Sequence, residues 1–363
     1  MSFATEPLYP HGTAARTAVL LVNLGTPDAP TPAALRRYLA EFLWDPRVVE
    51  ISRPVWWLIL HGVILRTRPA KSAAKYASIW TPEGSPLLSW TLRQAELLQA
   101  RLTDHGHDVV VRSAMRYGQP ALPAVLDALR AQGVTRVLTL PLYPQYAAAT
   151  TASTIDAVTQ WARQRRQVPE LRFINHYHDD PGYIAALAAS VRAHWASHGQ
   201  GEKLVMSFHG VPARSLTLGD PYHCECHKTA RLLAEALELP AGGWIVTFQS
   251  RLGRAQWLQP YTEPTLKRLA AEGVKHLDAI CPGFAADNLE TLEEIAIEAR
   301  DAFIGGGGEQ FSFVPCLNDR PDWIDALADL TERHLQGWPT KATGDAADLQ
   351  AQRQRALALG ASL

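Results

Sequence analysis

The sequence has 363 residues, of which 47% are hydrophobic and 20% charged, with a formal net charge of −1 at pH 7. This composition is typical of a globular protein and lacks the excess positive charge of a nucleic-acid binder, so we expect no nucleic-acid partner. The length exceeds what one hydrophobic core usually organises, which favours two lobes.

The start of the chain and the cysteine content predict a cytoplasmic protein. Residues 1–17 contain no charged segment followed by an apolar one, so we expect no signal peptide. Sparse cysteines fit reduced thiols better than a disulfide scaffold. The chain has four of them: Cys224, Cys226, Cys281 and Cys316.

Short apolar runs that end in turn residues recur along the chain and predict buried parallel strands. They cover residues 18–24, 109–112, 136–142, 171–177, 203–209, 244–250, 276–281 and 311–317. Helical patterns cover residues 183–198, 227–239, 262–272, 288–303 and 322–334. The alternation of strand and helix predicts an α/β fold with parallel sheets flanked by helices.

We place the lobe boundary near residue 165, where a polar run precedes the strand predicted at 171–177. This gives an N-terminal lobe of residues 1–165, a C-terminal lobe of residues 166–325, and a C-terminal helix and tail of residues 326–363. The tail after Pro339 is expected to be a frayed helix or disordered. Residues 27–101 form a long insertion between the first two strands, suited to covering a ligand.

The longest apolar run, residues 55–65, is interrupted by His61 and Gly62. It falls short of the roughly 20 residues that a membrane-spanning helix needs. Two interpretations remain for it: it lines a pocket, or it touches a membrane surface. The predicted location is therefore cytoplasmic, with peripheral membrane association left open.

Ligands of parallel sheets gather beyond the carboxyl ends of the strands, so the turns after each strand are the first candidates for a site. His209 ends the run 203–209, and Gly210 and Pro212 turn the chain there. The residues alone are compatible with a turn histidine bonded to backbone, and equally with a metal ligand or a base.

An acidic helix is predicted to begin after the strand at 276–281. Asp287 and Glu290 have the spacing of a capping box, which gives Glu290 a purely structural interpretation. Asp287, Glu290 and Glu294 also recur at helical spacing on one face, where three carboxylates repel unless they meet protons or cations. A route for cations explains all three.

The third turn, at residues 142–146, includes Tyr143 and leads into the small, hydroxyl-rich stretch 147–154. Aromatic rings beside small residues suit a flat apolar ligand. An ordinary loop packed on the core is an equal alternative for this turn.

Taken together, these motifs resemble the ferrochelatase family over nearly the whole chain. They occur in the order LVNLGTP (21–27), LYPQY (142–146), SFHGVP (207–212), GDPY (219–222), TFQSR (247–251) and DNLETL (287–292). The resemblance implies two similar Rossmann-like lobes with a porphyrin in the cleft between them. It also implies a lyase that inserts Fe²⁺ into protoporphyrin IX to form haem b and releases two protons. A coproporphyrin- or cobalt-inserting chelatase is the nearest alternative.

The resemblance assigns site residues by position. His209 matches the family's active-site histidine and Glu290 its glutamate, the pair implicated in metal delivery and removal of pyrrole protons. Asp287 and Glu294 resemble the accompanying acidic relay. The proposed porphyrin-binding residues are Leu24, Arg66, Arg68, Tyr143 and Trp257, with Trp80 a further wall candidate; core packing is the alternative for the tryptophans, and solvated surface positions for the arginines.

The family's metal-side position before the glutamate is histidine in some members and is Asn288 here, so an imidazole ligand is missing at that position. We expect no cofactor beyond the substrate Fe²⁺. Some relatives carry a 2Fe–2S cluster, but the stretch HCECH at 223–227 lacks a four-thiolate spacing, and we expect no cluster here.

Two interpretations from other classes compete with an enzyme of this kind. A nucleotide-binding enzyme is disfavoured because neither a G-x-G-x-x-G motif nor a P-loop follows a strand. A non-catalytic carrier of tetrapyrrole or metal would keep the pocket without needing a base.

Overall fold

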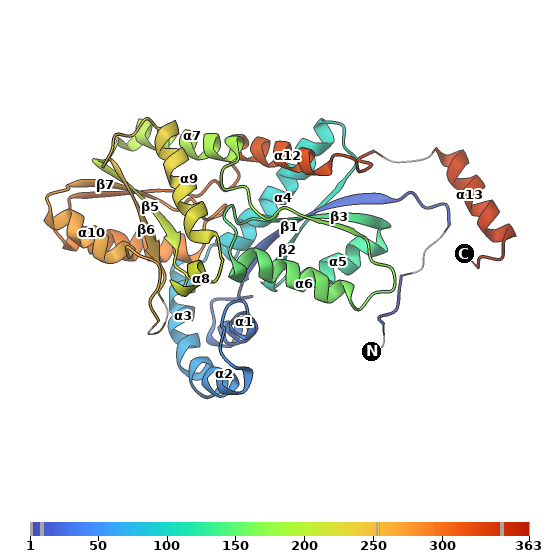
Figure 1. Ribbon diagram of the computed structural model, residues 1–363, viewed down its shortest axis with the longest axis horizontal. Helices are drawn as coiled ribbons and strands as arrows, with labels where there is room; N and C mark the ends of the chain where they lie inside the picture. The colour runs from blue at the N-terminus through green and yellow to red at the C-terminus, as the bar shows by residue number, and fades with distance from the viewer. Residues whose placement is uncertain (1–2, 8–10, 252, 254, 342–344, 363) are drawn as a thin grey trace.

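The computed structural model describes residues 3–7, 11–251, 253, 255–341 and 345–362. Figure 1 shows two bodies side by side, each built around its own parallel sheet. The strand orders are β2-β1-β3-β4 and β6-β5-β7-β8, so the two sheets repeat one topology. The predicted α/β fold of two lobes with parallel sheets is therefore confirmed.

The first sheet is centred on a fully buried strand. It consists of β1 (Arg16–Thr26), β2 (Val110–Gly118), β3 (Val134–Pro141) and β4 (Glu170–Phe173). Residues 18–22 of β1 have no exposed surface, which explains their unbroken apolar sequence. β2 runs further than its apolar stretch predicts, because it stays paired with β1 as far as Gly118 opposite Thr26.

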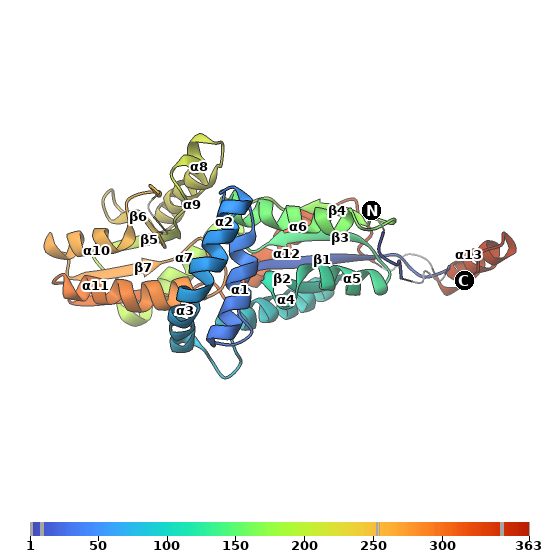
Figure 2. The same ribbon diagram turned by 90° about the horizontal axis from the view of Figure 1, so that it is seen from below.

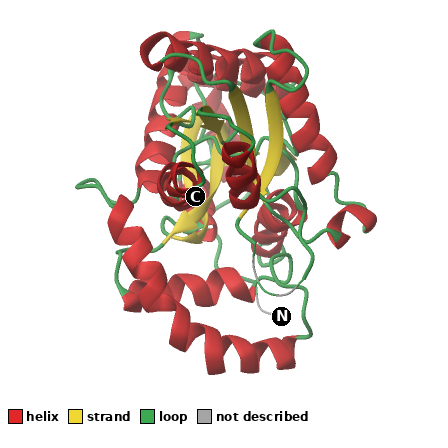
Figure 3. Ribbon diagram, turned by 90° about the vertical axis from the view of Figure 1, so that its left-hand side faces the viewer, coloured by secondary structure: helices red, strands yellow, loops and turns green. Residues whose placement is uncertain are grey.

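The second sheet repeats the arrangement with shorter strands. It consists of β5 (Lys203–His209), β6 (Trp244–Gln249), β7 (His276–Ile280) and β8 (Gln310–Val314). β5 is central and pairs in parallel with β6 and β7. All eight predicted strands are present, although those predicted at 171–177 and 311–317 end earlier, at Phe173 and Val314. Figure 3 shows the strands flanked by helices.

The insertion after β1 is helical. It comprises α1 (Pro32–Trp44), α2 (Arg53–Ile59), the π-helix η1 (Leu60–Ile64), α3 (Leu65–Ile79) and α4 (Pro86–Asp104). In Figure 1, α1, α2 and α3 project from one side of the molecule, below the junction of the two bodies, and in Figure 2 they cross in front of that junction. The rest of this half adds α5 (Leu122–Ala131), the π-helix η2 (Ala148–Ala152) and α6 (Ser153–Ala162).

The helices of the second half agree with the predicted patterns. They are α7 (Pro181–His198), α8 (Arg214–Thr217), α9 (Tyr222–Ala236), α10 (Thr262–Ala271), the π-helix η3 (Glu290–Ala299), α11 (Arg300–Gly305), α12 (Pro321–Leu335) and α13 (Ala346–Ala358). The helix predicted over 288–303 is η3 continued by α11. The tail forms α13, which begins where Asp345 accepts a hydrogen bond from the Asp348 N–H at 2.7 Å.

The two lobes share one core through α7 and α12. α12 packs against both α4 of the first lobe and α7. Buried aromatic rings fill this junction: Tyr177 and Tyr183 both lie against Trp323, with ring centroids 6.0 and 5.8 Å from it. The lobes are therefore held together by apolar packing as well as by the chain.

The first sheet extends beyond residue 165, the predicted lobe boundary. β4 lies after that residue, and Leu171 of β4 pairs with Val137 of β3. A polar run marks a surface loop, and here it marks the loop before the edge strand of the first sheet. We propose a boundary between Phe173 and Pro181; the second predicted boundary, at 325, falls inside the continuous helix α12.

Candidate active site

His209 lies at the carboxyl end of β5, paired with Gln249 of β6. Its Nδ1 is 2.7 Å from the carbonyl oxygen of Gly210. A proton on Nδ1 satisfies that carbonyl and leaves the Nε2 lone pair available to a proton or a metal ion. The backbone contact expected of a turn histidine and a chemical role for the other nitrogen are therefore compatible.

The turn after His209 is tightly packed. A Cβ on Gly210 would lie 2.7 Å from the Gln249 carbonyl oxygen and 3.1 Å from the Trp257 ring, so only glycine fits. The ring of Trp257 thus lies against the residue that follows His209, with its backbone bridged to Pro212. Trp257 is half-buried and lies beside the turn that follows His209.

Glu290 begins η3 and lies within electrostatic reach of His209. Burial raises the pKa of the Glu290 carboxyl, and the charge of His209 counteracts part of that rise. The Gln249 side chain joins β6 to η3, because its Nε2 donates a hydrogen bond to the Glu290 carbonyl oxygen at 2.8 Å. His209 and Glu290, which are 81 positions apart in the sequence, therefore lie near each other in the fold.

The acidic residues around Glu290 have different environments. Asp287 is buried, and its two carboxylate oxygens accept hydrogen bonds from the Thr291 hydroxyl, the Cys316 N–H and the Asn318 side chain at 2.7–3.2 Å. Glu294 instead accepts hydrogen bonds from the N–H and hydroxyl of Ser250, at the end of β6. These contacts give Asp287 a structural environment and leave Glu294 beside Glu290.

The expected capping box of Asp287 and Glu290 is wrong. The helix is capped by Asn288 and Thr291, whose side chains and N–H groups bond reciprocally. Asn288 thus takes the capping position because its short amide reaches the third residue of the helix. The Glu290 carboxylate therefore takes no part in capping the helix.

An apolar wall faces this site from the insertion. Leu24, Trp80 and Leu289 pack together against a buried cluster formed by Leu35, Tyr38, Ala73, Tyr76 and Tyr117. Leu289 directly precedes Glu290, so the cluster brings the predicted residues Leu24 and Trp80 close to it. The same cluster joins the end of β1 to helices α1 and α3.

Two tyrosines of this wall were not predicted as site residues. Burial raises the pKa of both Tyr38 and Tyr76, and the charge of Glu290 raises it further. The signal available in the sequence is the i, i+4 spacing of aromatic rings, since Tyr38 stacks on Phe42 and Tyr76 meets Trp80 edge-on. That spacing alone is also typical of core packing.

Ion pairs also join the helices of residues 27–101 to η3. The Lys75 ammonium lies 2.9 Å from the Glu293 carboxylate and 2.8 Å from that of Glu298. These ion pairs hold α3 against the helix that carries Glu290.

Tyr143 and the two arginines lie in contrasting places. The Tyr143 hydroxyl is buried and has no hydrogen-bond partner among the described residues. Arg66 and Arg68 are exposed on α3. Neither arginine forms an ion pair within the described part of the chain, so both are available to an anionic ligand.

The apolar run 55–65 forms α2 and η1 at the far end of the insertion. Its Trp57, Leu58 and Val63 side chains are 52, 64 and 56% exposed, so they do not line a closed pocket. Across the described residues we find no helix with the length and apolar content needed to cross a bilayer.

Comparison with known proteins identifies similar chains. The family model described as "Ferrochelatase" matches residues 16–335. A ferrochelatase of Methylibium petroleiphilum is 65% identical over 361 residues, covering 99% of each chain. One of Polaromonas sp. is 62% identical over 365 residues, covering 99% of this chain and 100% of the relative. SirB from Bacillus subtilis with Fe³⁺ has the same fold, with a TM-score of 0.51 at 12% identity over 90% of this chain and 100% of SirB.

Proposed function

This chain belongs to the ferrochelatase family and is a lyase that inserts iron into a porphyrin, and we propose that His209 and Glu290 carry out the insertion. The family supports protoporphyrin as substrate and haem as product rather than the cobalt or coproporphyrin alternatives. The observation that carries the proposal for the site is the convergence of an imidazole from β5 and a carboxyl from η3.

Insertion needs acceptors for the two pyrrole protons that leave as Fe²⁺ enters. The Nε2 of His209 can take one, because Nδ1 is engaged with the Gly210 carbonyl. Glu290 suits a proton acceptor, since burial raises the pKa of its carboxyl above the ordinary value and makes it a stronger base than an exposed carboxylate. Both side chains are also ordinary ligands of ferrous iron, so metal delivery and proton removal can be shared between them.

Glu294 offers a path for those protons away from the porphyrin. It lies four residues after Glu290 on η3 and bonds to Ser250. A π-helix is rare and often marks a functional site, and here it presents both carboxyls on the same side. Asp287 fits the relay less well because three donors occupy its oxygens.

We propose that the porphyrin lies against Leu24, Trp80, Tyr143 and Trp257. A flat ring hides its nitrogens in plane, so walls that bind a bent ring better lower the barrier to insertion. The exposed guanidinium groups of Arg66 and Arg68 suit the porphyrin carboxylates. Fe²⁺ is the substrate metal, and we propose that no 2Fe–2S cluster takes part, because the HCECH stretch lacks a four-thiolate spacing and its two cysteines differ in burial, Cys224 being exposed and Cys226 buried.

We further propose that the exposed apolar face of α2 and η1 rests on a membrane surface. Trp57, Leu58 and Val63 project from it, and Arg53 lies at the start of the same helix. An apolar face flanked by cations is the signature of a helix that lies in the headgroup region without spanning. This contact would place the helices of residues 27–101 beside the lipid in which an apolar porphyrin dissolves.

Anaerobic mixing of the purified protein with protoporphyrin and Fe²⁺ tests the proposal, with haem followed by its absorbance. The wild type should turn over many equivalents, whereas a carrier would give none. His209→Ala should bind porphyrin with unchanged affinity and lose at least about 10²-fold in rate, the usual contribution of a positioned base. A near-normal rate would remove His209 from the mechanism.

A further inference from the structure

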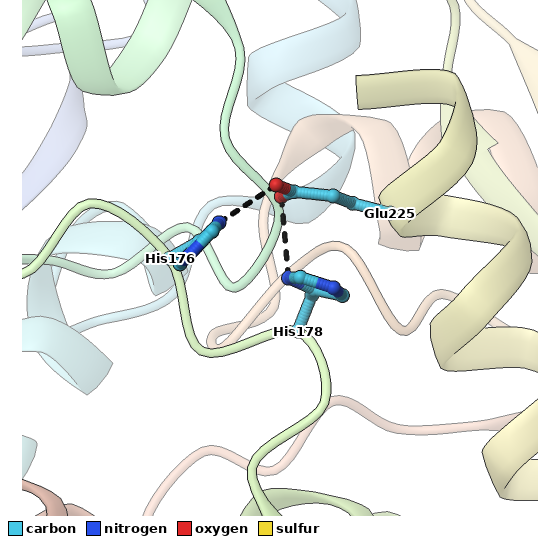
Figure 4. A group of neighbouring side chains, drawn as sticks. All are labelled: His176, His178 and Glu225. Atoms are coloured by element: carbon cyan, nitrogen blue, oxygen red, sulfur yellow. Dashed lines mark hydrogen bonds and ion pairs between the residues drawn. The ribbon is translucent and has the colours of Figure 1, made fainter. Parts of the chain in front are cut away.

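A second group of metal-ligating side chains lies outside the site just described. His176 and His178 lie in the segment between β4 and α7, and Glu225 lies in the first turn of α9 (Figure 4). Their nearest ligand atoms all lie within 4.8 Å of one another. Over the described residues this is the only group of three or more histidine, cysteine, aspartate or glutamate side chains with such spacing.

The two imidazoles share the one carboxylate unequally. His176 Nδ1 lies 2.7 Å from Glu225 Oε1, within hydrogen-bond distance. His178 Nδ1 lies 3.3 Å from Glu225 Oε2 but is not aligned for a hydrogen bond, and it has no hydrogen-bond partner among the described residues. His178 is only 6% exposed, so a buried polar nitrogen is aimed at the group without a partner.

We propose that His176, His178 and Glu225 form a second divalent transition-metal site, for an ion of the Zn²⁺, Fe²⁺ or Co²⁺ class. Two imidazoles and one carboxylate are the donor set these ions prefer. Bonds of about 2.1 Å allow ligand atoms to lie about 4.2 Å apart at most, so a small rotation of one ring completes the set. His176 is exposed, which gives the ion a way in.

The adjoining histidines of α9 do not belong to this site. His223 and His227 lie against each other with ring centroids 4.5 Å apart, and both pack on Phe248. The HCECH stretch therefore divides between two faces of the helix, with Glu225 alone turned toward the segment after β4.

A metal ion here would clamp the loop that carries Tyr143. Glu225 Oε2 accepts a hydrogen bond from the Tyr146 N–H at 2.7 Å. The adjacent Gln145 donates to Thr229 at 2.9 Å, and Thr229 donates to the His178 carbonyl at 2.7 Å. The ion would thus join α9 and the segment after β4 to one proposed wall of the porphyrin cleft.

Zn²⁺ titration of the full-length protein by calorimetry tests the proposal. The titration is done on His209→Ala, so that the proposed substrate site does not contribute. We expect one Zn²⁺ per chain, and at least about tenfold weaker binding once His176→Ala or Glu225→Gln is added. His223→Ala is the matched control and should leave the affinity unchanged.

Thermal unfolding gives a second measurement, because a ligand of the folded state raises the melting temperature. Zn²⁺ should raise it for His209→Ala and not for His209→Ala with His176→Ala. The exposed position of His176 keeps that variant folded, which circular dichroism verifies. Equal affinity or an equal shift in both proteins overturns the site without touching the role of His209. Loss of metal insertion in His209→Ala bears only on the proposed function.

Discussion

The Asn288 side chain accepts a hydrogen bond from the Thr291 N–H at 3.1 Å, and the Thr291 hydroxyl accepts one from the Asn288 N–H at 3.0 Å. This reciprocal pair satisfies the start of η3, which would otherwise leave N–H groups unpaired. Glu290 sits between them in the chain, and its carboxylate takes no part. Within the motif DNLETL, the cap is therefore formed by Asn288 and Thr291 and not by Glu290.

Glu290→Gln should slow metal insertion by at least about 10²-fold while the helix stays intact, because the amide cannot accept a proton in the same way. The measurement is the anaerobic rate of haem formation with saturating porphyrin. Asn288→Ala is the control: it should cost about 1 kcal/mol of unfolding free energy through loss of the cap. Its rate per folded molecule should change far less. If Glu290→Gln is harmless to the rate, Glu290 is not an acceptor.

Glu290→Gln should also stabilise the protein at high pH. Burial raises the pKa of Glu290 above its ordinary 4.5, so the folded state holds the proton more tightly than the unfolded chain. The stability that the folded protein gains from this tighter proton binding is present below the unfolded pKa of Glu290. It is lost as pH rises through the folded pKa. In urea unfolding at pH 8, Glu290→Gln should therefore have a higher free energy of unfolding than the wild type. The difference between the two proteins should vanish by about pH 4.

Glu96→Gln, at an exposed position of α4, is the control for the substitution itself and should change the unfolding free energy little at pH 8. A wild type more stable than Glu290→Gln at pH 8 would mean that the carboxylate is stabilised in the site rather than penalised.

Asp45→Asn should destabilise the junction of the insertion with the first sheet. The buried carboxylate accepts hydrogen bonds from Arg116 at 2.6 Å, Tyr117 at 2.8 Å and Ser153 at 2.6 Å. Burial raises the pKa of Asp45, but the hydrogen bonds and the Arg116 charge outweigh it and leave the pKa below 3.8. Removing the charge from this network should cost about 3 kcal/mol at pH 7 by urea unfolding.

A lowered folded pKa also fixes the pH range of the effect. The stability that Asp45 contributes is present above the unfolded pKa of 3.8 and is lost as pH falls through the folded pKa. The difference between wild type and Asp45→Asn should therefore shrink in acid. A difference independent of pH would assign the loss to packing instead.

Leu58→Asp should weaken binding to lipid vesicles. Leu58 is 64% exposed on the apolar face of α2, and a charge there opposes insertion into the headgroup region. Flotation with vesicles of mixed neutral and anionic lipid measures the bound fraction. Leu218→Asp, at a leucine 69% exposed in the second lobe, should bind like the wild type. Equal loss in both variants would argue against a specific face.

The sequence by itself determined the strands, the parallel α/β fold and the positions of His209 and Glu290. Buried parallel strands are apolar throughout, so the eight runs stand out from the helices around them. The turns at their carboxyl ends are the first candidates for a site because ligands of parallel sheets gather there. The motifs around His209 and Glu290 were distinctive enough to indicate the family.

Only the tertiary structure decided what each neighbour does. Local spacing cannot tell which side chain caps a helix, and Asn288 is the cap because the Asp287 carboxylate is engaged by Cys316 and Asn318. A polar run near residue 165 cannot reveal that β4 still pairs with β3. His176, His178 and Glu225 meet only because the chain folds two distant segments together, a contact that no periodicity encodes.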